Sequence, residues 1–460
     1  MNMMKLSSLG TLRNGMNFGR TAIKNGYKII GVADFANHVF PDLRSLNQID
    51  SSVVSSDDLL KAGDILFVRS NGNKNLVGRS LFIKNIFEPI CYSGFCIALR
   101  PDRGLICPEY LFYALRAPYC RRQYSYSQQT NITNLSQTVL GAVEVPIPKY
   151  ATQVKLAKLF TDIDVKIELN TRIYSELESM AKTLYDYWFV QFDFPDENGR
   201  PYRTSGGAME WNEKLKRKIP KGWKAGNLSN IANITMGQSP AGKSYNDSGE
   251  GITFYQGRTD FGIRFPTPRI YTTAPTRFAK KGDILLSVRA PVGALNIALE
   301  DCCIGRGLAA LNSKIGSQLH LLYTLYGFQR YFSVMDGNGT TFGSITKDGL
   351  FEIKIAIPKS TQLDAFEKIV YQIERDIQFI EKETRELESL RDWLLPMLMN
   401  GQAVILDTDD RAHSKRITQD KTYYNQQFEK WLQNQGLAAR GEVDLDTLRA
   451  IFDSMDDDDK

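Results

Sequence analysis

One stretch of the sequence matches the pattern of a phosphate-binding loop. Residues 237–244 read Gly-Gln-Ser-Pro-Ala-Gly-Lys-Ser, which fits the spacing G-x-x-x-x-G-K-S. Such a loop holds phosphates because its backbone N–H groups and the N-terminus of a following helix point at them. Here the next residues, YNDSGEGITF, are turn formers followed by a strand pattern. We therefore expect a surface loop here and not a site of nucleotide hydrolysis.

Other arrangements that could support catalysis are weaker still. Asp336 or Asp348, with Glu352 and Lys354, could hold Mg²⁺ in a nuclease. The matching segment of the first half of the chain, residues 144–146, lacks the lysine, so a strand with a solvated face is the preferred interpretation. A methyltransferase acting on amino groups would need an Asn/Asp-Pro-Pro-Tyr/Phe motif, and the sequence contains no Pro-Pro dipeptide. We expect no catalytic residues in this chain.

The histidines and cysteines predict neither a metal site nor disulfides. The histidines are scattered, and the cysteines show no C-x-x-C pair. No apolar run reaches the roughly 18 residues of a membrane-spanning helix, and the N-terminus lacks the apolar centre of a secretory signal. The expectation is a reduced, cytoplasmic protein without a bound metal, whose residues of these two types are His38, His320, His413, Cys91, Cys96, Cys107, Cys120, Cys302 and Cys303.

Charge divides unevenly along the 460 residues. The chain has 57 Lys plus Arg and 52 Asp plus Glu, a net charge of +5. Residues 1–150 carry 17 basic and 10 acidic side chains, and residues 209–360 carry 20 and 11, whereas residues 151–208, 361–400 and 401–460 are each net acidic. Two basic blocks separated by acidic segments indicate binding to a polyanion.

The two basic blocks are copies of each other. LSSLGTLRNG in the first matches LSNIANITMG in the second, and KAGDILFVRS matches KKGDILLSVR. CYSGFCIAL and CIGRGLAAL match more weakly, whereas the closing segments, VEVPIPK and FEIKIAIPK, align at an offset of 210 residues that persists beyond them. A repeat of this length indicates a duplicated domain and not a solenoid.

Each copy reads as a strand-rich domain with some helix. GDILFVRS and GDILLSVR are typical of strands entered through a Gly-Asp turn, and EVPIP and KIAIP of closing strands stopped by proline. PEYLFYALRAPYC and QLHLLYTLYGFQRYF have the apolar spacing of helices.

After each Ile-Pro-Lys the pattern becomes that of a long helix. Apolar positions recur at steps of four and three over residues 156–188 and again over residues 366–398. This heptad pattern predicts helices at residues 151–191 and 361–400, each roughly 50 Å long, that bury their apolar faces against each other. Asn170, which aligns with Ile380, is either a register-setting residue or a tolerated polar residue at a helix kink.

Two similar basic domains, each followed by a heptad helix, resemble the specificity subunit of type I restriction–modification enzymes. The residues that carry the resemblance are LSNIANITMGQSP, KKGDILLSVR, IAIPKSTQ and LESLRDWLLPMLMNGQ, with a looser set, LSSLGTLRNG, KAGDILFVRS, VPIPKYATQ and ELESMAKTLYDYWF, in the first half. The resemblance covers residues 1 to about 402 and implies an α+β fold, in which two similar strand-rich target-recognition domains are separated by two long antiparallel coiled-coil helices. The expected segments are residues 1–150 (first recognition domain), 151–191 (first helix), 192–208 (linker), 209–360 (second recognition domain), 361–400 (second helix) and 401–460 (acidic extension).

The same resemblance implies a non-catalytic subunit that reads a bipartite target in double-stranded DNA. Its implied partners are two methyltransferase (M) subunits and restriction/motor (R) subunits. S-adenosylmethionine, ATP and Mg²⁺ are expected on those partners, and no cofactor is expected on this chain. Two alternatives stay open: the specificity subunit of a methylation-only system, and a coiled-coil protein–protein adaptor that binds no DNA.

The sequence also departs from the family pattern. GMNFGRTA, from Gly15, lacks the Gly-x-Ser-Pro form that is present at residues 237–240, so the first opening loop is expected to differ in shape. Residues 403–460 extend past the end of the resemblance and finish in DDDDK, which is either an expression tag remnant or a natural acidic tail.

The candidate DNA-binding residues are polar or basic side chains of loops that flank the matched segments, because such side chains read base edges or hold phosphates. Arg121 and Arg122, set among tyrosines, are either a phosphate clamp or part of a capped helix end. The other candidates are Arg69, Asn71, Asn73, Lys74, Arg79, Gln128, Gln129 and Asn131 in the first domain, and Gln238, Lys243, Tyr245, Gln256, Arg258, Arg289, Arg306, Asn338 and Thr340 in the second.

Overall fold

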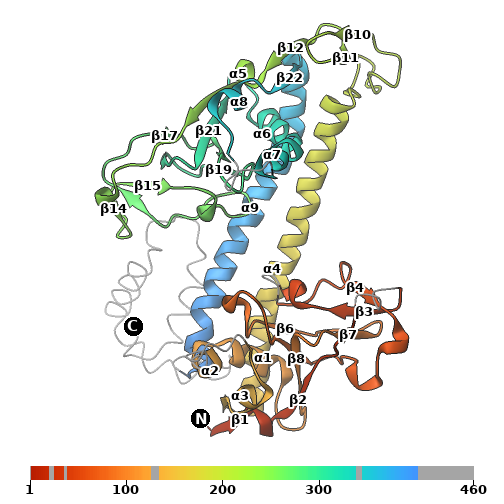
Figure 1. The fold of residues 1–460 in the computed structure, drawn as a ribbon, viewed down its shortest axis with the longest axis vertical. Coiled ribbons are helices and arrows are strands. Elements are labelled where there is room, and N and C mark those ends of the chain that lie inside the picture. Colours follow the sequence, from red (N-terminus) through yellow and green to blue (C-terminus); the bar gives the residue numbers. More distant parts are fainter. Residues whose placement is uncertain (1, 20–24, 36–38, 126–133, 338–343, 402–460) are drawn as a thin grey trace, which may run out of the picture. The chain divides into compact units, whose positions relative to one another are not determined.

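The computed structural model describes residues 2–19, 25–35, 39–125, 134–337 and 344–401. They form two compact units (Figure 1). Unit 1 comprises Met1–Glu168 and Glu386–Lys460, and unit 2 comprises Leu169–Arg385. Both long helices were predicted as segments separate from the recognition domains, but each unit takes in a part of both helices.

Unit 1 is built on two sheets and a strand pair. The four-stranded antiparallel sheet has the order β2 (Gly10–Asn14), β8 (Cys96–Pro101), β5 (Ile65–Val68), β6 (Ser80–Phe82). The three-stranded sheet has the order β4 (Asn47–Ile49), β3 (Tyr27–Ile30), β7 (Ile90–Tyr92), and β3 and β7 are parallel. The terminal strands of the domain pair with each other as β1 (Asn2–Lys5) and β9 (Glu144–Ile147). The helices of this domain are α1 (Pro108–Arg116), α2 (Pro118–Ser125) and α3 (Gln137–Gly141).

Unit 2 repeats this plan with the same strand order. Its four-stranded sheet is β13 (Ala232–Met236), β21 (Leu308–Ser313), β18 (Ile284–Ser287), β19 (Leu295–Ile297). The second sheet is β14 (Tyr245–Asn246), β16 (Tyr271–Thr272), β15 (Ile252–Tyr255), β20 (Cys302–Ile304), β17 (Phe278–Ala279), and its β15–β20 pair is parallel like β3–β7. The remaining elements are the pairs β10 (Met209–Asn212) with β11 (Arg217–Pro220) and β12 (Lys224–Asn227) with β22 (Lys354–Ile357), and the helices α5 (Leu228–Ile231), α6 (Gln318–Gly327), α7 (Gln329–Gly337) and α8 (Lys347–Phe351). The predicted duplication, strands and helices are therefore present.

The repeated GDIL segments form strands that are buried on both faces. In β5, Ile65 and Phe67 belong to the core shared with α1, whereas Leu66 and Val68 point into the core shared with β3 and β7. Side chains alternate across a strand, so a strand covered on both faces must be apolar throughout. Figure 1 shows α1 and the β3–β4–β7 sheet on opposite sides of the central sheet. The glycine of each Gly-Asp turn, Gly63 in this unit, has a positive φ, which explains its residue type.

The two long helices are α4 (Tyr150–Tyr185) and α9 (Ser360–Met399). At the C-terminal end of α4 the predicted helix widens into a π-helical turn at Asp186–Val190. Within unit 1, Leu156 and Phe160 share a core with Leu394 and Leu398. Within unit 2, later α4 residues share cores with earlier α9 residues, at Tyr174 with Ile377 and Ile380 and at Ala181 with Phe366 and Val370. In both units the two helices therefore run antiparallel.

Asn170 is buried and its polar group is satisfied. Its Nδ2 donates to Oε2 of Glu383 at 2.7 Å and to Oγ1 of Thr384 at 3.3 Å. These partners lie about one turn beyond Ile380 on α9, and α4 is a regular helix at this position. A buried amide with specific partners on the facing helix supports the register-setting interpretation over the kink.

The segment predicted as a linker, residues 192–208, is instead packed into unit 2. Phe192 and Phe194 are each 3% exposed, and Phe194 stacks on Trp223 with ring centroids 5.5 Å apart. The carboxylate of Asp193 accepts hydrogen bonds from the N–H and the hydroxyl of Thr204, both at 2.7 Å. The prolines and glycines shape turns as expected, but the alternating aromatic residues add enough apolar area to join the core.

Each recognition domain is attached to a long helix through a tyrosine and a buried carboxylate. In unit 1, Oη of Tyr113 on α1 donates to Oδ2 of Asp164 on α4 at 2.7 Å. In unit 2, Oη of Tyr323 on α6 donates to Oε1 of Glu374 on α9 at 2.6 Å. Both members of the second pair lie 210 residues after those of the first, so the contact is duplicated with the domain. Burial, and then the neighbouring carboxylate, raise the pKa of both tyrosines, which keeps them protonated as donors.

We predict that Tyr113→Phe lowers the free energy of unfolding by about 1.5–3 kcal/mol, because the mutation removes a charge-assisted hydrogen bond from a buried carboxylate. Tyr110→Phe is the matched control, since Tyr110 also lies on α1 and its hydroxyl donates at 2.7 Å to the neutral carbonyl of Pro146 on β9. Its expected cost is about 0.5–1.5 kcal/mol. Urea denaturation measures both, and a loss for Tyr113→Phe no larger than that of the control would contradict the anchoring role.

Candidate nucleic-acid interface

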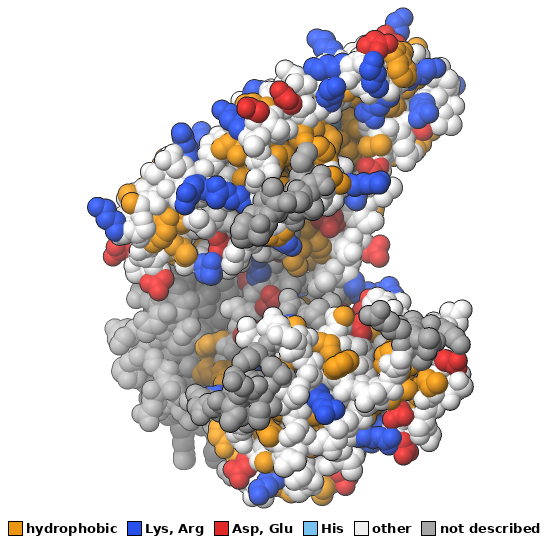
Figure 2. Space-filling model, in the orientation of Figure 1, with side chains coloured by type: hydrophobic (Ala, Val, Ile, Leu, Met, Phe, Trp, Pro, Cys, Tyr) orange, Lys and Arg blue, Asp and Glu red, His pale blue; other side chains and the backbone are white. Residues whose placement is uncertain are grey.

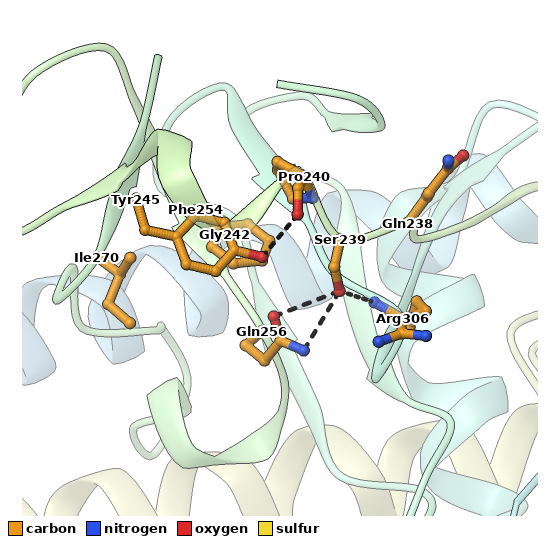
Figure 3. A pocket seen from close by; sticks show the side chains of 9 residues that line it. All are labelled: Gln238, Ser239, Pro240, Gly242, Tyr245, Phe254, Gln256, Ile270 and Arg306. Carbon is orange, nitrogen blue, oxygen red and sulfur yellow. Dashed lines mark hydrogen bonds between the residues drawn. The ribbon is translucent and has the colours of Figure 1, made fainter. Parts of the chain in front are cut away.

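A cavity of about 610 Å³ opens at the surface of unit 2. Four residues predicted to contact DNA line it, which are Gln238, Tyr245, Gln256 and Arg306. They come from three separate parts of the chain that the second sheet brings together (Figure 3). The complete lining consists of Gln238, Ser239, Pro240, Gly242, Tyr245, Phe254, Gln256, Ile270 and Arg306.

The first wall of the cavity depends on a glycine that both repeats share. The backbone of Gly237 lies so close to the β20–β21 turn that a Cβ atom would overlap the carbonyl oxygen of Gly305. Gln238 N–H donates to the carbonyl of Ile304 at 3.0 Å and holds the loop against this turn. The equivalent glycine of unit 1, Gly15, is packed in the same way on the carbonyl of Ser93. The matched glycines therefore place each opening loop directly beside this turn, which in unit 2 contains Arg306.

Ser239 connects the side chains around the cavity. Its Oγ accepts a hydrogen bond from the backbone N–H of Arg306 at 3.3 Å and lies 3.3 Å from Nε2 of Gln256 (Figure 3). The guanidinium of Arg306 and the side-chain amide of Gln238 make no hydrogen bond to other groups in the part of the chain that the structure describes. Arginine and glutamine side chains held by their backbone but free at their ends are suited to reading base edges.

The opposite wall is aromatic. Tyr245 and Phe254 stack with ring centroids 4.9 Å apart, and Oη of Tyr245 donates to the carbonyl of Pro240 at 3.0 Å. That bond fixes the tyrosine ring against the opening loop. A cavity with one aromatic wall and one polar wall suits a partner that presents both flat apolar surface and hydrogen-bonding edges, as nucleotides do.

The segment that matches a phosphate-binding loop lacks the helix that such a loop needs. Gly242–Ser244 form a single 3₁₀ turn that passes directly into strand β14. Ser244 Oγ donates to the carbonyl of Ala241 at 2.7 Å, which closes this turn. Lys243 is exposed at its surface. The predicted surface loop is therefore correct, and its lysine points to solvent next to the cavity.

The remaining candidates of unit 2 lie on nearby loops. Arg258 is exposed at the start of the 3₁₀ turn Arg258–Asp260, two residues after Gln256. Arg289 is exposed after β18, where its backbone pairs with Ser344. Asn338 and Thr340 lie outside the described residues.

In unit 1 the candidates cluster after β5. Arg69 Nη1 donates to the carbonyl of Gly94 at 3.4 Å, and its own carbonyl accepts from Leu135 at 2.8 Å. The side-chain oxygens of Asn71 and Asn73 accept from backbone N–H groups two residues on, so they shape the loop. Arg79 lies at the end of this loop, half-buried. The side chain of Lys74, together with Gln128, Gln129 and Asn131, lies outside the described residues.

Arg121 and Arg122 are both exposed on α2. Arg122 Nε donates to the carbonyl of Pro118 at 3.2 Å, a bond within its own helix. For Arg122 this contact supports the interpretation as part of a capped helix, and for Arg121 both interpretations stay open.

Sequence reasoning missed one residue at the equivalent place of unit 1. The alignment of CYSGFCIAL with CIGRGLAAL puts Gly94 where unit 2 has Arg306. A Cβ on Gly94 would overlap the side-chain oxygen of Asn17, which therefore occupies this space. The two units thus present different side chains, an exposed asparagine and an exposed arginine, beside the same turn. The signal for Asn17 in the sequence is the departure of the GMNFG segment, which contains it, from the Gly-x-Ser-Pro form of the other copy.

Groups for acid–base or metal chemistry are not gathered at this site. Burial lowers the pKa of His320 to about 3, which keeps the ring neutral in the core of unit 2. Within the described ranges, no three His, Cys, Asp or Glu side chains lie together in a way that could hold a metal ion. None of the helices that the structure describes is long and apolar enough to cross a membrane.

A family model described as the type I restriction modification DNA specificity domain matches residues 1–179 and 220–389. The chain belongs to this family. The two matched ranges correspond to the two copies of the repeat, each with part of its long helix.

Individual members of the family resemble the chain over most of its length. A protein of Methanocaldococcus jannaschii named for the specificity subunit of type I restriction enzyme MjaX is 29% identical over 404 residues, which cover 86% of this chain and 91% of that protein. The HindI specificity subunit of Haemophilus influenzae is 22% identical over 75% of this chain and 87% of its own length. The crystal structure of a type I restriction–modification S subunit from M. genitalium has the same fold, with a TM-score of 0.53 at 16% identity over 86% of this chain and 96% of that one.

Gly237→Ala is expected to lower the free energy of unfolding by about 1–3 kcal/mol. The added methyl group would overlap the backbone carbonyls of Ile304 and Gly305, which cannot move away without shifting the whole turn. Gly242 lies five residues further along the same loop with open space around its Cβ position, so Gly242→Ala should stay within about 0.5 kcal/mol of the wild type. Chemical denaturation compares the two variants. Equal stability of both would show that the close approach at Gly237 does not shape the loop.

Proposed function

We propose that this chain is the DNA-specificity subunit of a type I restriction–modification complex and reads a target of two unlike half-sites. One observation carries the proposal. The two copies of one basic domain present different side chains at an equivalent place, Arg306 in unit 2 and Asn17 in unit 1. A duplicated fold with an altered contact position is what two readers of different sequences require.

Affinity and sequence preference come from different groups of residues. Exposed lysines and arginines of both basic blocks, drawn in blue in Figure 2, contact phosphates, so that binding weakens steeply as salt rises. At the cavity of unit 2, Arg306, Gln238 and Gln256 contact base edges in the major groove, where arginine pairs best with guanine and glutamine with adenine. Unit 1 uses the loop after β5 and Asn17 in the same way.

The long helices separate the two half-sites. Their antiparallel packing within each unit and the hydrogen bonds of Asn170 support a coiled-coil spacer of fixed register. A rigid spacer imposes a constant distance between the bases that the two domains contact, on the order of one turn of the duplex. The target is therefore two short sequences around a gap that is not read.

The outer face of α4 is a surface for partner subunits. Leu169, Ile173 and Met180 are 47%, 38% and 58% exposed, and their spacing places them on one face of the helix. An exposed apolar row on a helix of a soluble protein is typical of a protein interface. We assign it to the methyltransferase subunits, two of which serve the two half-sites. Restriction/motor subunits join the complex, S-adenosylmethionine, ATP and Mg²⁺ bind to these partners, and the complex acts on DNA in the cytoplasm.

Arg306→Ala should weaken discrimination at one position of a single half-site by about 5- to 150-fold, which corresponds to the roughly 1–3 kcal/mol of a bidentate base contact. Lys224→Ala, an exposed basic residue on β12 outside the cavity lining, is the control and should leave the motif unchanged. The measurement is the methylated motif in DNA from cells that express each variant with its methyltransferase partner. An intact motif with Arg306→Ala, or altered preference in both half-sites, would reject this assignment.

A further inference from the structure

A fully buried arginine connects the recognition sheet of unit 2 to the long helix α9. Arg264 is 0% exposed and follows the 3₁₀ turn Arg258–Asp260. Its Nη2 donates to Oε1 of Glu374 at 2.8 Å, and its Nη1 donates to Oη of Tyr326 at 2.8 Å. Glu374 is the carboxylate that also accepts the hydrogen bond of Tyr323. One carboxylate on α9 therefore holds both α6 and a loop of the recognition domain.

The same helix also binds the backbone of this loop. Oε1 of Glu381 accepts from the backbone N–H groups of Arg264 and Phe265, both at 3.3 Å. Nη2 of Arg385 donates to the carbonyl of Phe265 at 2.6 Å and to Glu381 at 2.7 Å. Side chain and backbone of the loop are thus fixed by three charged residues spread over three turns of α9. A loop held in this way has one position along the helix and one orientation.

The fixed loop continues directly into the candidate reading site. The backbone N–H of Gln256, at the edge of the cavity, donates to Oδ2 of Asp260 at 3.0 Å. The carbonyl of Arg264 accepts from Ile297 on β19 at 2.9 Å, and Asn296 holds Gly262 through bonds of 3.1 Å in both directions. The segment from Gln256 to Arg264 is therefore a short, hydrogen-bonded connection between α9 and the cavity.

In unit 1 the equivalent carboxylate, Asp164, forms its ion pair with an arginine from a different element. Asp164 receives its cation from Arg391 of α9, with Nη1 and Oδ1 2.9 Å apart, and not from its recognition sheet. The residue of unit 2 that lies 210 positions before Arg391 is Ala181, which carries no charge. The equivalent carboxylates therefore pair with arginines from different parts of the fold. Asp164 pairs with Arg391 of the long helix α9, whereas Glu374 pairs with Arg264 of the recognition domain.

A buried ion pair adds little to stability compared with apolar side chains of similar size, since both charges lose their hydration. In some proteins such a pair specifies one geometry, because a misplaced partner leaves a charge buried and unpaired. We propose that Arg264 is a positioning residue that sets the orientation of the unit 2 recognition sheet on the long helices, and through it the gap at which the second half-site is accepted. This inference rests on the proposed function.

The test separates positioning from stability. The double variant Arg264→Met/Glu374→Leu replaces the pair with apolar side chains. It also removes the acceptor of the Tyr323 hydroxyl, so we expect it to fold with a melting temperature a few degrees below that of the wild type. Each protein is assembled with its methyltransferase partner and given duplexes with the same half-sites and gaps shorter or longer by one base pair. We expect the wild type to favour its own gap by about tenfold or more, and the double variant by about threefold or less, with unchanged preference for the half-site sequences.

Two further variants decide the remaining outcomes. Lys224→Met removes an exposed cation of unit 2 that lies on β12, outside this loop and its hydrogen bonds, and it should keep the full gap preference. Arg264→Lys keeps the charge but not the planar fork, so it should relax the preference even if the double variant fails to assemble. An undiminished gap preference in an assembled Arg264 variant overturns the inference. A wild type with no preference for half-sites or gap would instead overturn the proposed function.

Discussion

A buried carboxylate on each long helix is the constraint on which the arrangement of each unit depends. Asp164 and Glu374 occupy equivalent positions of the repeat, and each accepts a hydrogen bond from a tyrosine of its recognition domain. A buried carboxylate costs free energy unless hydrogen-bond donors surround it. A shift of the domain that supplies those donors would leave the carboxylate buried and unpaired, which is strongly unfavourable. This interaction links each strand-rich domain to the part of the long helices that belongs to its unit.

The packing of the recognition sheets also restricts the loops at the ends of their strands. Strands such as β5 are apolar on both faces, and their ends have little freedom because both layers are packed. At the rim, glycines at Gly15 and Gly237 let the opening loop lie directly on the next turn. Beside the same turn, unit 1 then presents Asn17 and unit 2 presents Arg306, and the four-stranded sheets of the two units have the same strand order. The side chain beside this turn therefore differs between the copies while the surrounding strand order stays the same.

Local patterns predicted most of the fold, because they report on periodic burial. The heptad spacing revealed α4 and α9, and the repeated Gly-Asp entries revealed β5 and β18. The sequence identified Gln238, Gln256 and Arg306 as candidates but did not show that they line one cavity, because their proximity depends on how the strands pair. Arg264 escaped prediction altogether. Its partner Glu374 lies 110 residues away, and a single arginine in a loop of a basic domain reads as a solvated side chain. The segment 192–208 was misjudged because proline and glycine content outweighed its alternating aromatic residues.

The chain belongs to the type I DNA specificity family and carries two copies of one domain, and each unit contains parts of both long helices. The spacer role proposed for these helices is the central claim. The most direct test adds seven residues to the middle of both α4 and α9 and maps the methylated motif in cells that contain the partner subunits. Seven residues lengthen each helix by about 10.5 Å, which is about three base pairs of duplex. The account predicts the same two half-sites with a gap longer by about that amount. An active complex with an unchanged gap, or with different half-sites, would contradict it.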